Sequence, residues 1–552
     1  MAKVYKVFLL WVFLCLGLGV FPSAALANSL SITNVSLEDR NQTDNTVVVE
    51  FDISWENSWR TDESWDAAWV FMKACQGAAC SSAWIGVHAM LNTAGTDPSD
   101  TSTGSNEDLT IVVPSDKVGA FIYRASNGTG TTTATNVRLT VDYATSPMTA
   151  GDTDQIQIRV YGIEMVYIPN GDFWIGDGNE TSESAYAFHD SNNSAVQITN
   201  SLTNNIWVDT NANDDIQLDT TGYGIGIDGD GGIDTDDNGA VNNASFPTGY
   251  KAFYIMKYEL SQGQYRDFLN TLTRVQQNTR TGTDLSVGVT SVTNRYVMSG
   301  GSTPSYRNYI RCPATIHTSN PVVVYADADG DGTGNESNDG EWIAMNYLSW
   351  MDLAAYADWA GLRPITELEF ERAARGPTAP VYGEYAWGTT YIIQVTGISN
   401  AGQASEVATT TGGGLSTYGS GVSGPLRVGF AATSSTTRIT GSVGYYGIME
   451  LSGNTEERVV SLGNSTGRSF TGTHGDGILT TIISYEGNAT NTDWPGIDGI
   501  SLRGVTGATG SGFRGGSAVS ASSSLAISSR DRAALTLTTR QFAFGGRLGR
   551  TP

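Results

Sequence analysis

Apolar and polar residues alternate along much of the first third of the chain, and this pattern restricts the possible folds more than any other feature. In Thr46–Trp55, apolar side chains lie at every second position from Val47 to Ile53, the period of a strand with one buried face. Further strand-like runs follow between turn-rich gaps, at residues 68–73, 83–91, 109–113, 120–124, 137–143 and 155–161. About seven strands at this spacing predict a β-sandwich over residues 28–162.

This segment also holds a group of tryptophans and two cysteines. The rings could fill and cover the core of the sandwich, or form a face that stacks on carbohydrate. Both interpretations stay open for Trp55, Trp59, Trp65, Trp69 and Trp84. Cys75 and Cys80 are spaced to close a small loop by a disulfide, which an exporting compartment permits. Cys312 would then be a buried thiol.

Residues 1–27 are typical of an export signal. Lys3 and Lys6 precede the apolar run Val7–Val20, and Ala25–Ala27 offers small residues for cleavage. No later stretch has the roughly 20 consecutive apolar residues that a membrane-spanning helix needs. We therefore expect an exported protein, secreted or at the cell surface, without a transmembrane segment.

Acidic residues outnumber basic ones, and the formal net charge is −25. This charge argues against nucleic acid as a partner, because nucleic-acid phosphates are bound through Lys and Arg. Divalent cations suit such a surface better. Gly, Ser, Thr and Asn are abundant and only 16% of the residues are charged, which predicts a mostly β protein. A length of 552 residues predicts more than one domain.

The residue pattern changes at Met165, where period-2 alternation gives way to helical signals. Capping boxes at 261–264 and 366–369, and an apolar stripe over about 346–360, predict three helices. We therefore place a domain boundary at 162–163.

Several sequence blocks of this second part occur in the order found in one known family. They are Met165–Gly176, Phe253–Tyr265, Ala355–Glu369, Tyr385–Gly388, Tyr446–Asn454, Arg514–Ser517 and Gly546–Arg550. On these blocks, residues 163–552 resemble the formylglycine-generating enzyme (sulfatase-modifying factor) family, whose fold resembles a C-type lectin. The resemblance implies an α+β domain of this kind after the β-sandwich. The acidic insertions would lie at about 177–246 and 326–341.

The same resemblance bears on catalysis. Enzymes of the family carry two cysteines after the serine of an Arg-Gly-Gly-Ser loop. This chain retains the serine as Ser517 but has Ser520 and Leu525 at the cysteine positions. Cu(I) requires soft thiolate ligands, so we expect no copper. We expect no iron either, because the histidines are scattered, at His88, His189, His317 and His474. The sequence therefore leans against the family's catalysis.

In some relatives with this fold, diversified by retroelements, ligands bind next to the same Arg-Gly-Gly-Ser loop. By this resemblance, the loop and the small residues after it form a candidate ligand-binding face. The residues concerned are Arg514, Ser517, Val519, Ser520 and Ser522. The ligand would be a protein or a glycan at the surface. The sequence allows a homo-oligomer without requiring one.

Two acidic stretches have the alternating carboxylates of a calcium loop. The first holds Asp327, Asp329 and Asp331, with Asp339 near the closing position. The second holds Asp234, Asp236 and Asn238. The alternative for each stretch is a solvated acidic loop. By the family resemblance, Asn454 matches a further calcium position. Calcium is therefore the expected cofactor.

The main hypothesis is an exported, non-catalytic binding or cell-surface structural protein with calcium-braced loops. One alternative is a divergent sulfatase-modifying or oxidase-like enzyme of the same family. Another is a retroelement-diversified ligand-binding protein. Bound copper or iron would favour the enzyme, and calcium alone would favour a binding protein.

Overall fold

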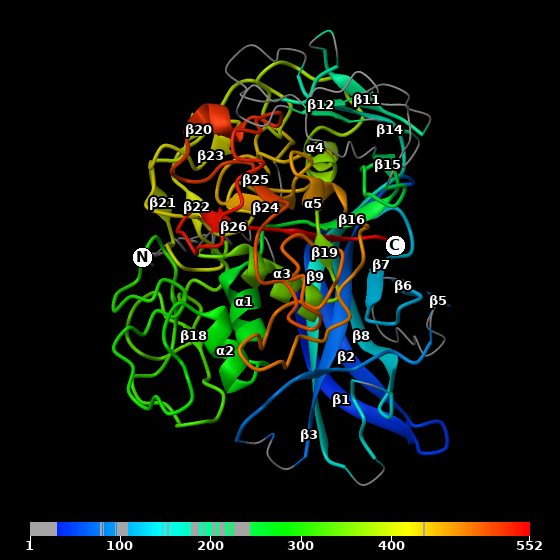
Figure 1. The fold of residues 1–552 in the computed structure, drawn as a ribbon, viewed down its shortest axis with the longest axis vertical. Coiled ribbons are helices and arrows are strands. Elements are labelled where there is room, and N and C mark those ends of the chain that lie inside the picture. Colours follow the sequence, from blue (N-terminus) through cyan, green and yellow to red (C-terminus); the bar gives the residue numbers. More distant parts are fainter. Residues whose placement is uncertain are drawn as a thin grey trace, which may run out of the picture.

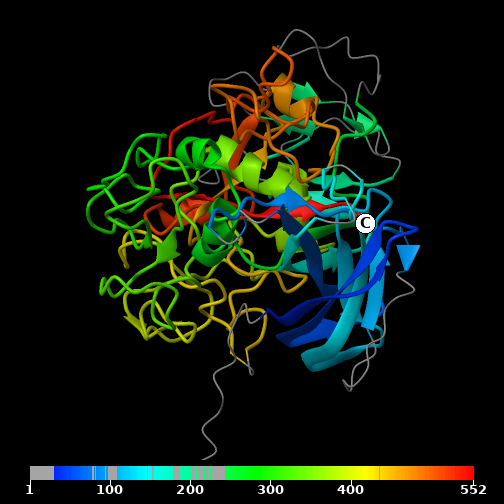
Figure 2. The same ribbon diagram turned by 90° about the horizontal axis from the view of Figure 1, so that it is seen from below.

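The computed structural model of the protein describes residues 30–77, 80, 82–93, 95–96, 109–145, 147–151, 154–177, 187–190, 192, 194–200, 206–208, 216–218, 220–221, 224–225, 243–433 and 436–552. Within these residues, strands outnumber helices (Figure 1), as expected of a mostly β protein. Figure 2 shows the blue and cyan N-terminal strands gathered on one side of the molecule.

The N-terminal strands make up most of a twelve-stranded sheet. Its main path runs β19-β27-β16-β9-β3-β7-β6-β5, and β2 branches from β3 to pair with β1 and β8. A hydrophobic cluster that includes Val49, Phe51 and Leu139 packs this branch against Ala68 and Val70 of β3. The strands up to this point are β1 (Ser31–Asn41), β2 (Thr46–Arg60), β3 (Trp65–Gln76), β4 (Val87–His88), β5 (Gly95–Thr96), β6 (Leu109–Val113), β7 (Ala120–Arg124), β8 (Gly128–Asp142) and β9 (Ile156–Ile168).

Most of the strands expected from the alternation are present. The predicted strand at 83–91 is wrong, because only Val87 and His88 form one. The backbone beside them bonds to other partners: the Gly86 amide donates to the Thr271 carbonyl, and the Ala89 amide to the Met72 carbonyl. Strand β1 gives no signal in the sequence, since most of its side chains are exposed.

Strand β9 crosses the expected domain boundary at 162–163 without a break. It pairs with β3 from Trp65↔Tyr167 to Gln76↔Ile156, and its last residues also pair with β16 (Phe253–Met256). The sheet continues to β27 (Leu548–Arg550) and β19 (Arg363–Pro364). One hydrophobic cluster combines side chains of β3 and β7 with side chains of the second part, so the two parts share a hydrophobic core.

The few helices follow local capping signals. The predicted capping boxes at 261–264 and 366–369 are confirmed at the starts of α1 (Gln262–Leu269) and α4 (Glu367–Arg375). The helix predicted over 346–360 begins later, as α3 (Trp350–Trp359), because Ser349 caps it. The remaining two are α2 (Arg274–Arg280) and α5 (Ser465–Arg468). No helix in the described part of the chain is long and apolar enough to cross a membrane.

Short strand pairs and long loops make up the rest of the second part. A three-stranded sheet, in the order β25-β24-β26, carries the Arg-Gly-Gly-Ser loop. Its strands are β24 (Glu456–Val460), β25 (Ser511–Arg514) and β26 (Phe544–Gly545). The two-residue and three-residue strands are β10 (Phe173–Ile175), β11 (Val196–Ile198), β12 (Ile206–Val208), β13 (Ile216–Leu218), β14 (Thr220–Thr221), β15 (Gly224–Ile225), β17 (Ile310–Arg311), β18 (Tyr325–Ala326), β20 (Ile393–Gln394), β21 (Ile398–Ser399), β22 (Val407–Ala408) and β23 (Leu415–Ser416). Cys75 and Cys80 form the expected disulfide, and Cys312 is a buried free thiol.

Candidate functional site

The Arg-Gly-Gly-Ser loop leaves β25 through two glycines with left-handed backbones. Gly515 has φ 83° and Gly516 has φ 67°, a region that glycine adopts without steric cost. A Cβ at Gly516 would lie 2.5 Å from Leu525 Cδ1. The loop therefore brings the backbone at 516 close to the side chain at 525.

Arg514, expected to contact a ligand, is buried beneath this loop. Its guanidinium donates to Glu367 Oε2 at 2.9 Å, to Glu371 Oε1 at 2.6 Å and to the Ile527 carbonyl at 2.6 Å. Both glutamates lie on α4, so Arg514 anchors β25 to that helix. Its burial argues against direct contact with a ligand.

Ser517 and Ser520 lie side by side under the loop. Their Oγ atoms are 3.0 Å apart, and Ser520 Oγ donates to Glu456 Oε1 at 3.2 Å. Arg532 donates to the same carboxylate, and burial raises the pKa of Glu456. The adjacent cavity, lined by Glu456, Arg514 and Arg532 among others, holds about 10 Å³. That is the size of one water site, so this cavity could hold about one water molecule.

The remaining loop residues pack into the protein. Leu525, which the sequence resemblance places at the family's second cysteine position, is fully buried against Tyr385 and Trp387. Val519 packs with the aromatic pair at the base of β25, and Ser522 begins a single 3-10 turn. Of the five expected ligand-binding residues, Ser520 and Ser522 are the more accessible hydroxyls.

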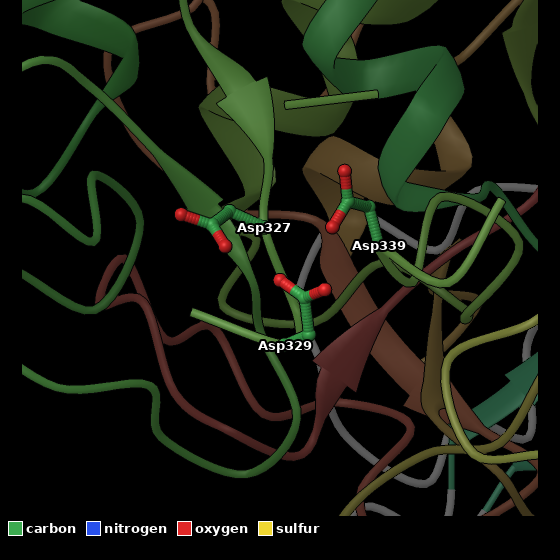
Figure 3. A group of neighbouring side chains, drawn as sticks. All are labelled: Asp327, Asp329 and Asp339. Carbon is green, nitrogen blue, oxygen red and sulfur yellow. The ribbon is translucent and has the colours of Figure 1, made fainter. Parts of the chain in front are cut away.

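The first acidic loop brings three carboxylates together at the end of β18 (Figure 3). Oxygens of Asp327, Asp329 and Asp339 lie within 4.8 Å of one another, and those of Asp329, Asp331 and Glu336 form an overlapping, exposed group. Asp327 and Asp339 are both 0% exposed. This spacing and oxygen chemistry fit a hard cation such as Ca²⁺.

Hydrogen bonds within the loop hold these carboxylates in place but leave one oxygen unused. Asp339 Oδ2 accepts from the Glu336 amide at 2.6 Å, and Asp327 Oδ1 accepts from the Gly330 amide at 2.8 Å. Asp339 Oδ1 is buried and has no hydrogen-bond partner among the described residues. Burial raises the pKa of Asp339, and the charges of Asp329 and Asp327 add to the shift. Arg311 pairs with Asp327 and offsets part of the negative charge.

Four further residues were expected to bind a metal. Asp234, Asp236 and Asn238 lie outside the described residues. Asn454 is buried, and its Oδ1 accepts from the Leu426 amide at 2.8 Å. Its amide group also donates to Glu259.

Around Asn454 lies a group of buried acids that the sequence analysis did not single out. Glu457 makes a two-pronged ion pair with Arg547, at 2.9 Å and 2.7 Å. Burial raises the pKa of Glu450 to about 7, and one of its oxygens, Oε2, has no partner in the described part of the chain. The sequence did contain a sign of this acidic group, because Glu450 and Glu457 flank the Gly-Asn motif.

A larger cavity, of about 230 Å³, lies between β1, β9, α1 and α3. Its apolar wall includes the aromatic rings of Phe71, Tyr161, Tyr356 and Trp359, and its charged wall includes Arg266, Asp267 and Glu341. Arg266 also donates to Asn335 Oδ1 at 2.7 Å and pairs with Glu341. Because both partners belong to the first acidic loop, this loop and the cavity share a wall. The sequence gives no local sign of the cavity, which combines segments distant along the chain.

These features define a β-rich protein in which short strands and long loops surround an Arg-Gly-Gly-Ser turn. The model of the sulfatase-modifying factor enzyme 1-like domain family matches residues 228–548, and the chain belongs to this family. The match confirms the resemblance seen in the sequence blocks and begins after the block at 165–176. A search of curated proteins finds none that matches the chain.

Proposed function

We propose that this chain is an exported, non-catalytic binding or cell-surface structural protein whose family domain is braced by calcium. Residues 1–27 would direct export. The disulfide between Cys75 and Cys80 supports this part of the proposal, because disulfides persist in oxidising compartments. Residues 28–162 would form a β-sandwich, and the two strand layers packed around Val49 and Val70 support that assignment.

The absence of the family's catalysis is supported by the chemistry of the loop. Ser520 and Leu525 offer a hydroxyl and a hydrocarbon where the resemblance implies two thiolates, and neither holds Cu(I). The cavity lined by Glu456, Arg514 and Arg532 among others has room for about one water. Binding without turnover is therefore the better interpretation of this domain.

The observation that carries the calcium proposal is the buried, unpartnered oxygen of Asp339. An unpaired carboxylate oxygen away from water costs free energy, and a cation shared with Asp327 and Asp329 would remove that cost. The bound ion would fix residues 327–341 and, through Arg266, the charged wall of the 230 Å³ cavity. This cavity, with aromatic rings opposite charged side chains, is a candidate site for a polar ligand such as a glycan.

Thermal unfolding with and without calcium tests this proposal. Excess Ca²⁺ should raise the Tm over that in chelator, because a ligand that binds only the folded state stabilises it by about 2.7 kcal/mol at a hundredfold excess over Kd. Mg²⁺ should do less, since it requires a stricter octahedral site. Asp339→Asn keeps the side-chain shape and should remove most of the calcium effect.

Glu63→Gln is the matched control, because it removes one negative charge from an exposed position outside the loop. It should keep the full calcium response. Identical melting curves in excess calcium and in chelator would refute the calcium site and show that the loop is a solvated acidic surface.

A further inference from the structure

One lysine is buried between two carboxylates at the junction of the N-terminal strands and the family domain. Lys257 Nζ lies 3.2 Å from Asp66 Oδ2 and 3.2 Å from Glu164 Oε2. The side chains of Lys257, Asp66 and Glu164 are 6%, 1% and 2% exposed. The three groups are therefore held in contact and almost entirely away from bulk water.

Three neighbouring strands fix these positions. Asp66 lies on β3 and Glu164 on β9, and Lys257 follows directly after β16. Ala68 pairs with Glu164, so Asp66 is two residues along β3 from that pair and on the same face. The Lys257 amide donates to the Glu164 carbonyl at 2.9 Å. The backbone thus sets the approach of the amine to both carboxylates.

The two oxygens of Asp66 have different surroundings. Oδ1 accepts from Ser58 Oγ at 2.9 Å and from the Trp59 amide at 2.9 Å. Oδ2 accepts from Trp55 Nε1 at 3.3 Å and faces Lys257. Two fixed donors at one oxygen stabilise negative charge that develops there when the carbonyl carbon is attacked.

Protons for such an attack are available within the cluster. Burial raises the pKa of Glu164, and this carboxyl lies 3.2 Å from Lys257 Nζ, where it can exchange protons with the amine. Burial acts to lower the pKa of Lys257. The electrostatic interactions with Tyr258, Glu164 and Asp66 are together larger than the effect of burial, and they raise the pKa of Lys257. The reaction requires that Lys257 passes its proton to Asp66, which gives a neutral amine and a neutral acid, and burial of both side chains disfavours their charged forms.

We propose that Lys257 and Asp66 form an intramolecular amide bond. The neutral Lys257 Nζ attacks Cγ of protonated Asp66, and the developing charge on Oδ1 is held by Ser58 and Trp59. Glu164 takes a proton from the nitrogen and gives its own to Oδ2. The Cγ–Oδ2 bond breaks, and one water leaves. Overall, the ammonium of Lys257 and the carboxylate of Asp66 are converted into an amide and one water. Glu164 ends the reaction in the protonation state in which it began.

Such a bond would join β3 to the end of β16 covalently. Fixed neighbours react with effective concentrations far above those in solution, and expulsion of water from a buried site favours the amide. The cross-link goes beyond the proposed function and does not depend on calcium or on a ligand.

Intact mass spectrometry of the full folded chain, after reduction of the Cys75–Cys80 disulfide, tests the proposal. The mass should be lower than the sequence mass by one water. Proteolysis should yield one branched peptide that contains both Lys257 and Asp66. Lys257→Arg keeps the positive charge but should restore the full sequence mass.

Glu164→Gln keeps the size of the proton carrier without its acidity, and it should slow or abolish the loss of water while circular dichroism stays native. A folded wild-type chain with its full sequence mass would overturn the proposal and leave an ion pair. A loss of water that persists in Lys257→Arg would also overturn it, because a cyclised aspartate loses the same mass without the lysine.

Discussion

At the scale of single residues, Ser517 and its neighbours decide what chemistry the family loop can perform. Among the described residues, the hydrogen-bond partner of Ser517 Oγ is another hydroxyl, Ser520 Oγ, which in turn is bound to Glu456. A serine hydroxyl beside a carboxyl of raised pKa is a weak nucleophile and a poor ligand for a soft metal. The loop is therefore a hydrogen-bonded turn that offers hydroxyl groups at Ser517 and Ser520.

We expect the purified chain not to convert the cysteine of a sulfatase-type peptide to formylglycine, even with copper and oxygen supplied. The reason is that Ser520 and Leu525 cannot supply thiolates. Peptide mass spectrometry measures the outcome. Product that forms with the wild-type chain and is lost in Ser517→Ala would refute the non-catalytic assignment.

Residue positions were only partly predictable. The loss of the cysteines can be read from spacing after Ser517, and the acidic loop from the alternation of Asp327, Asp329 and Asp331. The burial of Arg514 cannot be predicted from the sequence, because its partners Glu367 and Glu371 lie far away along the chain. Ion pairs between distant segments leave no local pattern.

At the scale of elements, β3 meets the family domain through a buried amine. Lys73 Nζ lies 2.9 Å from His88 Nδ1 and 3.3 Å from the Gly477 carbonyl, with Asp358 and Asp476 also acting on it. Burial lowers the pKa of Lys73 to about 7, and the two aspartates act in the opposite direction. The folded chain thus releases this proton near neutral pH.

This shift gives the stability a definite pH dependence. Above a pH of about 7 the unfolded chain still binds the proton that folded Lys73 has lost, up to the ordinary pKa of lysine at about 10.4. The contribution of Lys73 to the free energy of unfolding should therefore rise with pH across that window, by at most about 1.4 kcal/mol per pH unit. Lys73→Met should flatten the rise between pH 7 and 9, as measured by urea unfolding.

Lys117→Met is the control for loss of a lysine from the same N-terminal segment, because the Lys117 ammonium is only partly buried and bonds the Asn92 carbonyl. Its pH dependence should follow the wild type. Parallel curves for the wild type and Lys73→Met would show that the amine is not neutral in the folded chain.

Elements with strong local signals were predicted well. Alternation located β2, and capping boxes located the starts of α1 and α4. The exposed strand β1 was not predicted, because a strand with mostly exposed side chains shows no alternation. The region at 83–91 was predicted wrongly, because its backbone forms hydrogen bonds with distant segments instead of a continuous strand. The two-layer arrangement and the 230 Å³ cavity depend on such long-range contacts as well.

At the scale of the whole molecule, the two parts share a sheet and a core. Trp69 of β3 is fully buried, and its Nε1 donates to the Ala360 carbonyl after α3 at 2.8 Å. Phe71 meets the Trp359 ring edge-on, with centroids 5.0 Å apart. The N-terminal strands thus complete the hydrophobic packing of the family domain.

We therefore expect heat to unfold the chain in one cooperative transition by differential scanning calorimetry. Trp69→Ala should lower the free energy of unfolding of that single transition by about 3–5 kcal/mol, because it removes a large buried ring from the shared core. Two transitions, of which Trp69→Ala shifts only one, would instead support domains that are independent on either side of 162–163.

Strand β27 has a consequence for the order of events during synthesis. It lies between β16 and β19 and pairs with both, although it is translated long after them. Because β27 separates β19 from β16, β19 can join the sheet only after β27 has been made. Pairing over such sequence distances is slow. In the exported protein proposed above, this end of the sheet would therefore stay open during transit and form only after residues 548–550 have been delivered.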